Sequence, residues 1–146
     1  MKIYLASDHA GFRLKEAVKK FLLKKKYQVK DQGASFFVLD DDYPDFIKSA
    51  AKAISKNPKD RAIIFGGSGQ GEAIMANRFK NVRAAVVYKY DKKIITLSRE
   101  HNDANVLSLG ARFLKEKEAL AAIQLWLKTK FSGEAKHKRR IAKIDK

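Results

Sequence analysis

No cysteine occurs anywhere in this chain of 146 residues. Disulfide bonds, thiolate metal sites and a cysteine nucleophile or base are therefore excluded. Long apolar runs are absent as well, because none approaches the roughly 20 residues that span a bilayer. The N-terminus reaches Asp8 and His9 before any apolar segment long enough for a signal peptide, so we interpret it as mature. These features predict a cytoplasmic protein with no membrane segment, and its length suits one domain with one core over residues 1–146.

Negative charge is scarce, because 16 Asp and Glu face 32 Lys and Arg and leave a formal net charge of +16. Such a balance is found in nucleic-acid-binding proteins, and it equally suits a protein that attracts small anions such as phosphates. Most lysines are spread along expected helix faces, as in Lys15–Lys26, which is typical of solvated surfaces. A denser run, Lys136–Arg140, lies in a basic C-terminal arm over residues 133–146. Composition alone does not decide between the two kinds of partner.

Short apolar runs alternate with helical patterns from end to end. The runs expected to form strands are 2–6, 27–31, 61–65, 83–87 and 105–109. The expected helices cover about 12–26, a stretch from Pro44, 71–79, 91–100 and 115–131, and the polar segment 133–146 is expected to be a short helix or arm. This alternation predicts a parallel sheet with helices on both faces, and ligands in such sheets bind outside the carboxyl ends of the strands. Candidate site residues therefore follow the strands, at 7–9, 66–72 and 110–112.

A glycine loop is the sharpest local feature. Residues 66–72 read Gly-Gly-Ser-Gly-Gln-Gly-Glu, between an expected strand and an expected helix. Such a loop lets main-chain N–H groups approach an anion at a helix start. It is neither a P-loop, which would need Gly-Lys-Ser/Thr, nor a dinucleotide fingerprint, which would need glycine at position 72. The alternative is a loop that only turns tightly, with Glu72 as a favourable charge near the helix dipole.

Other polar residues gather near the strand ends. Asp8 and His9 follow the first strand, where His9 could also serve only to cap the next helix. The segment 98–105 contains His101 and several carboxylate or amide side chains, which are costly to bury without partners. A metal site made of Asp8, His9 and His101 has no supporting His-X-His or His-X3-His spacing, so we expect none.

Four segments occur in one order: Asp8-His9-Ala10-Gly11, Asp42-Tyr43-Pro44, Gly66–Glu72 and His101–Asn105. Together they closely resemble the ribose-5-phosphate isomerase B family, which includes the galactose-6-phosphate isomerase subunits. The resemblance extends from residue 3 to about residue 141. It implies a Rossmann-like three-layer α/β/α sandwich on a five-stranded parallel sheet. It also implies a homodimer, in some members a tetramer, with active sites at the subunit interface. The implied activity is cofactor-free interconversion of ribose 5-phosphate and ribulose 5-phosphate.

The resemblance assigns roles in opening the sugar ring. His101 corresponds to the histidine that transfers a proton at the ring oxygen of the furanose. Asp8 corresponds to the residue that contacts the sugar hydroxyls or the ring oxygen in that step, and Tyr43 to a tyrosine that lines the sugar site.

The base that acts after ring opening is also implied by the resemblance. Many family members have a cysteine at the position of Gly66, whereas a second branch has a serine and a glutamate that match Ser68 and Glu72. We therefore predict that Glu72 moves the proton between C2 and C1 and that Ser68 orients it. The enediolate also needs N–H donors for its oxyanion. The predicted substrate contacts of the loop are Gly67, Gly69, Gln70 and Gly71, with Asn102 assisting.

The phosphate needs cations, and the resemblance provides His9 and Arg112. Family members add two arginines from the C-terminal arm of the partner subunit. Arg140 matches the second of these, whereas Lys136 replaces the first. Lysine keeps the charge but loses the bidentate fork of arginine, and Arg139 is a candidate to compensate.

Two alternatives remain from sequence alone. Within the same enzyme class, the substrate could be allose 6-phosphate, galactose 6-phosphate or a tetrulose phosphate. In a different class, the protein would be a basic module that binds nucleic acid with a steep salt dependence. That alternative leaves the glycine loop and the polar segment 98–105 without a role.

Overall fold

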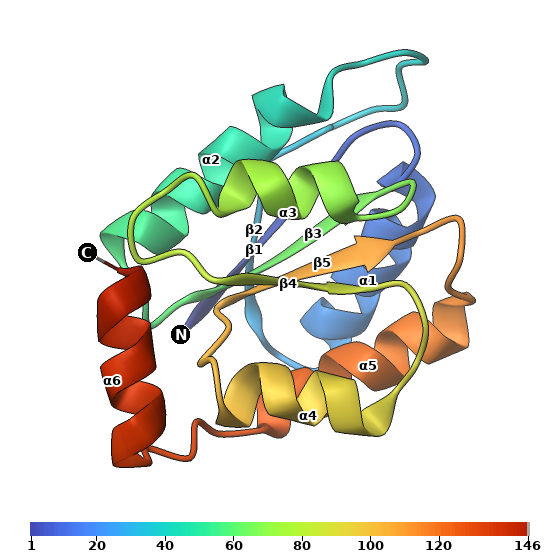
Figure 1. Cartoon of the computed structure of the whole chain (residues 1–146). Helices are drawn as coiled ribbons and strands as arrows, with labels where there is room; N and C mark the ends of the chain where they lie inside the picture. The colour runs from blue at the N-terminus through green and yellow to red at the C-terminus, as the bar shows by residue number, and fades with distance from the viewer. Residues whose placement is uncertain (146) are drawn as a thin grey trace.

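The computed structural model describes residues 1–145, and a five-stranded sheet forms its centre (Figure 1). The strands are β1 (Lys2–Ser7), β2 (Gln28–Asp31), β3 (Arg61–Gly66), β4 (Ala84–Val87) and β5 (Val106–Gly110). Every neighbouring pair runs parallel, in the order β2-β1-β3-β5-β4. The parallel five-stranded sheet expected from the sequence is thus confirmed.

Helices cover both faces of this sheet. On one face lie α1 (Phe12–Lys24), α4 (Lys92–Glu100) and α5 (Glu116–Lys128), and on the other lie α2 (Tyr43–Lys56) and α3 (Gln70–Ala76). Successive strand residues alternate between the two faces. Ile63 and Leu107 belong to the hydrophobic cluster under α1, α4 and α5, whereas Ile64 and Val106 belong to the cluster under α2 and α3. The result is the expected three-layer sandwich.

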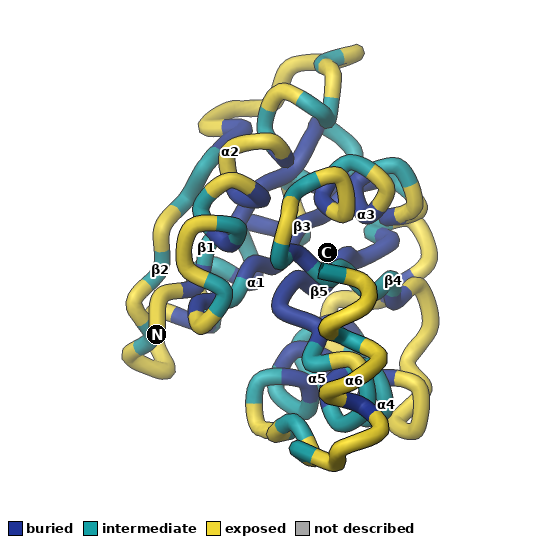
Figure 2. Tube along the Cα trace, turned by 60° about the vertical axis from the view of Figure 1, so that its left-hand side comes forward, coloured by how far each residue is buried: buried dark blue, intermediate teal, exposed yellow. Residues whose placement is uncertain are grey.

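The segment after α5 forms a sixth helix, α6 (Ala135–Ile144), which stands apart from the layers (Figure 1). Most of it is exposed (Figure 2). The linker before it is tied to the end of α4, because the amide of Ser132 donates to the carbonyl of Glu100 over 3.1 Å.

Among residues 1–145, no helix is long and apolar enough to cross a membrane.

Three helices end earlier than expected, and a local structural feature explains the end of two of them. Helix α1 ends at Lys24, because Lys26 adopts a positive φ of 63°. Helix α3 ends at Ala76 rather than residue 79, because the side chain of Asn77 bonds both the amide (2.7 Å) and the carbonyl (3.1 Å) of Ala84 at the start of β4. Helix α5 ends at Lys128 rather than residue 131.

Lys15 is an exception among the helix lysines, because its side chain is fully buried. Its Nζ donates to both carboxylate oxygens of Asp31, at 2.8 and 2.9 Å, and Lys19 adds a third contact at 2.7 Å. Asp31 in turn accepts the amide of Gly33 over 3.1 Å. Burial opposes the charge on Asp31, but the two ammonium groups outweigh it and lower the pKa of that carboxyl. This ion pair fixes the start of the loop that leads from β2 past the carboxyl edge of the sheet.

Candidate active site

The carboxyl ends of β1 and β3 lie side by side, at a point where the chain leaves the two strands toward opposite edges of the sheet. Ligands in open α/β sheets bind at such a switch point. Asp8 follows β1 directly and is 7% exposed, and its Oδ1 accepts the amide of Gly11 over 3.0 Å. Glu72 lies in the first turn of α3, which follows β3, and is 4% exposed. Two buried carboxyl groups therefore lie at this edge of the sheet, near enough for the charge of Asp8 to act on Glu72.

Burial raises the pKa of Glu72, which a hydrogen bond from its own main-chain amide opposes and the charge of Asp8 reinforces. A carboxylate with a raised pKa takes up a proton more readily than an exposed one, which suits a general base. In the described structure Glu72 contacts no cation, so desolvation determines the shift.

The glycine loop is tightly built around this carboxylate. A Cβ atom at Gly66 would overlap the carboxylate of Glu72, so a side chain at this position would require that carboxylate to move. Gly69 has a φ of +79°, a conformation that glycine adopts without a steric penalty, and its carbonyl accepts from the buried hydroxyl of Ser108 over 2.6 Å. The Oγ of Ser68 accepts the amide of Gln70 over 3.3 Å. Within residues 1–145 Ser68 makes no hydrogen bond to Glu72, so its predicted orienting role stays a prediction.

Tyr43 and Arg112 approach the same loop from two other elements. Tyr43 begins α2, and a Cβ atom at Gly71 would lie 2.7–2.8 Å from its ring and hydroxyl, so these two residues are in close contact. Arg112 follows β5, and its amide donates to the carbonyl of Gly67 over 3.0 Å. Its guanidinium side chain runs along Gly67. The exposed Arg112 thus provides a positive charge beside the glycine loop.

His9 has a partner that the sequence did not indicate. The Oδ1 of Asp41 accepts both the main-chain amide and the ring Nδ1 of His9, each over 2.8 Å. This hydrogen bond raises the pKa of His9; burial opposes it, and the charges of Asp8, Asp41 and Asp40 add to it. His9 therefore carries its positive charge to higher pH than a free histidine. Nothing in the run Asp40–Asp42 marks its middle member as the one that faces His9.

Asp8, His9 and Asp41 also bring one possible ligand atom each within 4.8 Å of one another. One pair of these atoms is already the hydrogen bond between His9 Nδ1 and Asp41 Oδ1. Hydrogen bonding explains the grouping, and we assign no metal to it.

Four predicted site residues lie elsewhere on the chain. His101 caps the C-terminus of α4, Asn102 follows it, and Lys136 and Arg140 lie on α6. The turn between α4 and β5 is at the amino edge of the sheet, one strand length from Glu72. The five residues of β5, at about 3.3 Å each, separate the two edges by roughly 16 Å. One chain therefore does not bring these four residues to the glycine loop.

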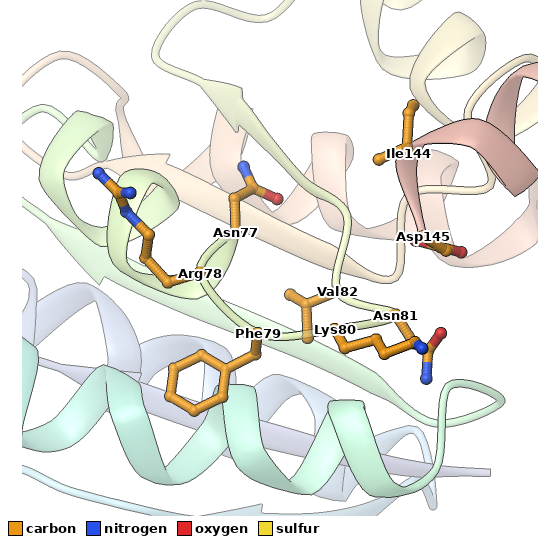
Figure 3. A pocket seen from close by; sticks show the side chains of 8 residues that line it. All are labelled: Asn77, Arg78, Phe79, Lys80, Asn81, Val82, Ile144 and Asp145. Carbon is orange, nitrogen blue, oxygen red and sulfur yellow. The ribbon is translucent and has the colours of Figure 1, made fainter.

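The amino edge also holds a cavity of about 280 Å³, between the segment after α3 and the end of α6 (Figure 3). Its lining residues, Asn77–Val82 with Ile144 and Asp145, include none of the predicted site residues. Asp145 is held there by Arg83, whose Nη1 lies 2.6 Å from its carboxylate. The cavity is therefore separate from the chemistry at the carboxyl edge.

Comparison with known proteins supports the resemblance over nearly the whole chain. The family model described as Ribose/Galactose Isomerase matches residues 3–144. A probable ribose-5-phosphate isomerase B of Mycoplasma genitalium is 41% identical over 143 residues, covering 97% of this chain and 92% of that protein. A ribose-5-phosphate isomerase B of Mycolicibacterium paratuberculosis is 39% identical, covering 97% of this chain and 87% of its own length.

Solved structures agree. The Mycoplasma genitalium ribose-5-phosphate isomerase B with bound ribulose-5-phosphate superimposes with a TM-score of 0.93 at 39% identity, covering 99% of this chain and 93% of that one. The Thermotoga maritima ribose 5-phosphate isomerase gives a TM-score of 0.91 at 41% identity, covering 99% and 97%. This chain therefore belongs to the ribose/galactose isomerase family, among the ribose-5-phosphate isomerases of type B.

Proposed function

We propose that this protein interconverts ribose 5-phosphate and ribulose 5-phosphate in cytoplasmic pentose phosphate metabolism. The observation that carries the proposal is Glu72, a buried carboxylate with a raised pKa beside a glycine loop at the switch point of the sheet. The relatives that cover nearly the whole chain support the substrate, because they are named for this reaction.

Opening of the furanose ring comes first. His101 transfers a proton at the ring oxygen, and Asp8 binds the sugar hydroxyls. Opening exposes the aldehyde at C1 and makes the proton on C2 acidic.

Proton transfer follows. Glu72 removes the C2 proton, which gives an enediolate, and returns the proton to C1, while the hydroxyl proton of C2 moves to O1. The product is the ketose, so no electron leaves the substrate and no cofactor is needed. Main-chain amides of the glycine loop and the side chain of Asn102 donate to the oxyanion, and one such donor contributes about 3 kcal/mol to lowering the barrier.

Binding of the phosphate relies on positive charge. His9, whose pKa the hydrogen bond to Asp41 raises, and Arg112 supply it from the carboxyl edge. Lys136 and Arg140 supply it from the amino edge of a second chain.

A homodimer completes the site in this proposal, because His101 and Glu72 lie at opposite edges of the sheet within one chain. Exposed apolar residues support association. Large apolar side chains lie exposed on α3, after β4, on α4 and after β5: Ile74, Tyr88, Tyr90, Ile94 and Phe113. Patches of this kind often mark protein interfaces. A tetramer would be a pair of such dimers.

An isomerase assay tests the substrate and the base together. Ribose 5-phosphate, allose 6-phosphate and galactose 6-phosphate are offered to the wild type and to Glu72→Gln without added metal. We expect the pentose phosphate to be turned over best, and Glu72→Gln to lose at least about a hundredfold in kcat, as a lost general base implies. Turnover of none of these sugars, or an active Glu72→Gln, contradicts the proposal. Salt-dependent binding of nucleic acid would then be measured next.

Mixing two inactive variants tests the shared site. Glu72→Gln and His101→Ala are unfolded and refolded together in equal amounts. Half of the dimers then contain one chain of each kind, and each of these has one intact site, so about a quarter of wild-type activity returns. If the site lies within one chain, the mixture stays inactive.

A further inference from the structure

Helix α6 has one buried side chain among its described residues, and it belongs to a histidine. His137 is 3% exposed, whereas Lys136, Lys138 and Arg140 around it are exposed. A buried histidine on an otherwise exposed basic helix requires a specific partner.

That partner is His101. The two imidazole rings stack with centroids 4.1 Å apart and planes within 16° of parallel. The residues come from different elements, the C-terminal end of α4 and α6. Two hydrogen bonds tie the linker before α6 to α4: the amide of Ser132 donates to the carbonyl of Glu100, and the side-chain Nε of Arg99 donates to the carbonyl of Thr129 over 3.2 Å.

Apart from this stacking contact, the ring Nε2 of His137 has no partner among the described residues. Its Nε2 is buried and has no hydrogen-bond partner in residues 1–145, and the nearest Glu134 oxygen is 4.0 Å away. Burial lowers the pKa of His137; the charges of His101, Lys136 and Arg140 act the same way, and Glu134 opposes them. The lowered pKa favours the neutral form of the His137 ring.

We infer that His137 is a positioning residue for His101: its flat neutral ring fixes the plane of the His101 imidazole for proton transfer at the ring oxygen of the sugar. The inference rests on the proposed function and extends it to a residue that touches no substrate. Helix α6 then serves both phosphate binding and ring opening, because it carries Lys136 and Arg140 for the phosphate and His137 for the contact with His101.

Two substitutions separate the flat ring from simple space filling. His137→Leu fills the volume without a flat ring, and His137→Phe keeps a ring that stacks. A misplaced proton-transfer group can cost about a hundredfold in rate. We expect His137→Leu to lower kcat on ribose 5-phosphate at least about tenfold, and His137→Phe to stay within about threefold of wild type. The matched control is Lys138→Ala on the same helix, which should match wild type.

A second readout distinguishes ring opening from proton transfer at carbon. Ribulose 5-phosphate has its O5 blocked by phosphate, so it cannot close a five-membered ring and needs no ring opening. Exchange of its C1 proton in ²H₂O, followed by NMR, therefore depends on Glu72 and not on His101. We expect His137→Leu to keep this exchange within about twofold of wild type while ribose 5-phosphate turnover falls, since only a group that acts in ring opening is misplaced.

Each result has a defined meaning. Equal loss of turnover and exchange in His137→Leu shows a general structural role and overturns the inference, and so does full activity in that variant. A His137→Phe variant as impaired as His137→Leu overturns the role of stacking. A wild type that exchanges and isomerises nothing overturns the proposed function itself.

Discussion

The carboxylate of Glu72 fills the space that a side chain at Gly66 would need. The two positions are six residues apart and are brought together because β3 ends at Gly66 and α3 begins at Gln70. This contact gives a physical reason for the difference from the branch that, by the resemblance, has a cysteine at the position of Gly66. A side chain at 66 and the Glu72 carboxylate in its observed position exclude each other, so one of them would have to move.

This exclusion predicts a strong coupling between the two positions. Gly66→Ala should destabilise the protein by about 1–3 kcal/mol, as overpacking of a core does, and should displace the Glu72 carboxylate. In a Glu72→Ala background the same change should cost little, because the space is empty. Chemical unfolding of the four proteins measures the coupling. Equal costs in both backgrounds would contradict it.

The buried carboxylate of Glu72 also predicts how stability depends on pH. Its folded-state pKa is raised from 4.5 by burial. The folded protein then holds the proton more tightly than the unfolded chain, so the contribution of this group to stability is present below the unfolded pKa and lost as pH rises through the folded pKa. Glu72→Gln, which never ionises, should melt at a higher temperature than wild type at pH 7.

The difference between these two proteins should shrink toward pH 4, where both side chains are neutral. Thermal unfolding over a pH series checks this. A Glu72→Gln variant that is less stable than wild type at pH 7 would show that the charged form is favoured in the fold. The acid limb of kcat/KM for the wild type should correspondingly lie above pH 4.5.

The Asp41–His9 hydrogen bond predicts a pH-dependent KM. Asp41→Asn keeps the size of the side chain but removes the charge that raises the pKa of His9. His9 then loses its proton at lower pH, so KM for the sugar phosphate should rise about threefold at pH 7–8, as a weakened hydrogen bond between charged groups implies. The effect should fade in acid, and kcat should change less than KM.

Asp40→Asn is the matched control for this prediction, because Asp40 is the weakest of the charges that raise the pKa of His9. A KM that is unchanged in Asp41→Asn, or changed equally in both variants, would remove His9 from phosphate binding.

Lys136 predicts a difference in phosphate affinity. Its ammonium group lies 3.0 Å from Glu134, and both side chains are about half exposed (53% and 52%). The Lys136 ammonium group can therefore leave Glu134 and bind a phosphate instead. Lys136→Arg should lower KM about threefold through a bidentate contact, whereas Lys136→Ala should raise it about tenfold. Steady-state kinetics measure both, with Lys138→Ala as the control. An unchanged KM in all three variants would place the phosphate elsewhere.

The fold was predictable from the sequence because apolar periodicity and turn residues act locally. The strand expected at 61–65, the glycine loop after it and the family were all indicated by the sequence, and each is confirmed, the strand ending one residue later at Gly66. What the sequence could not indicate depends on contacts across the fold. Asp41 is one of three consecutive aspartates, and only packing of the β2–α2 loop selects it for His9. Lys15 has the sequence pattern of a solvated lysine, yet its side chain is buried and its ammonium group pairs with Asp31 on β2.

The division of the predicted site between two edges of the sheet was likewise invisible in the motifs. His101 and Glu72 belong to adjacent motifs in the sequence, but one follows a helix and the other follows a strand. In a parallel sheet these positions face opposite ends of the molecule. The catalytic roles of His101, Asp8 and Ser68 stay predictions for the experiments above.

The Glu72 carboxylate at the Gly66 position also bears on how the protein meets oxidative stress. A sulfur atom there would be open to stepwise oxidation to sulfenic and sulfinic acids, the later steps of which are irreversible. The chain has no cysteine at all, and a carboxylate has no such series of states. The chemical state of the Glu72 carboxyl group therefore changes only by gain or loss of a proton. Peroxide, which would inactivate a relative that depends on a thiol, leaves this carboxyl group unchanged.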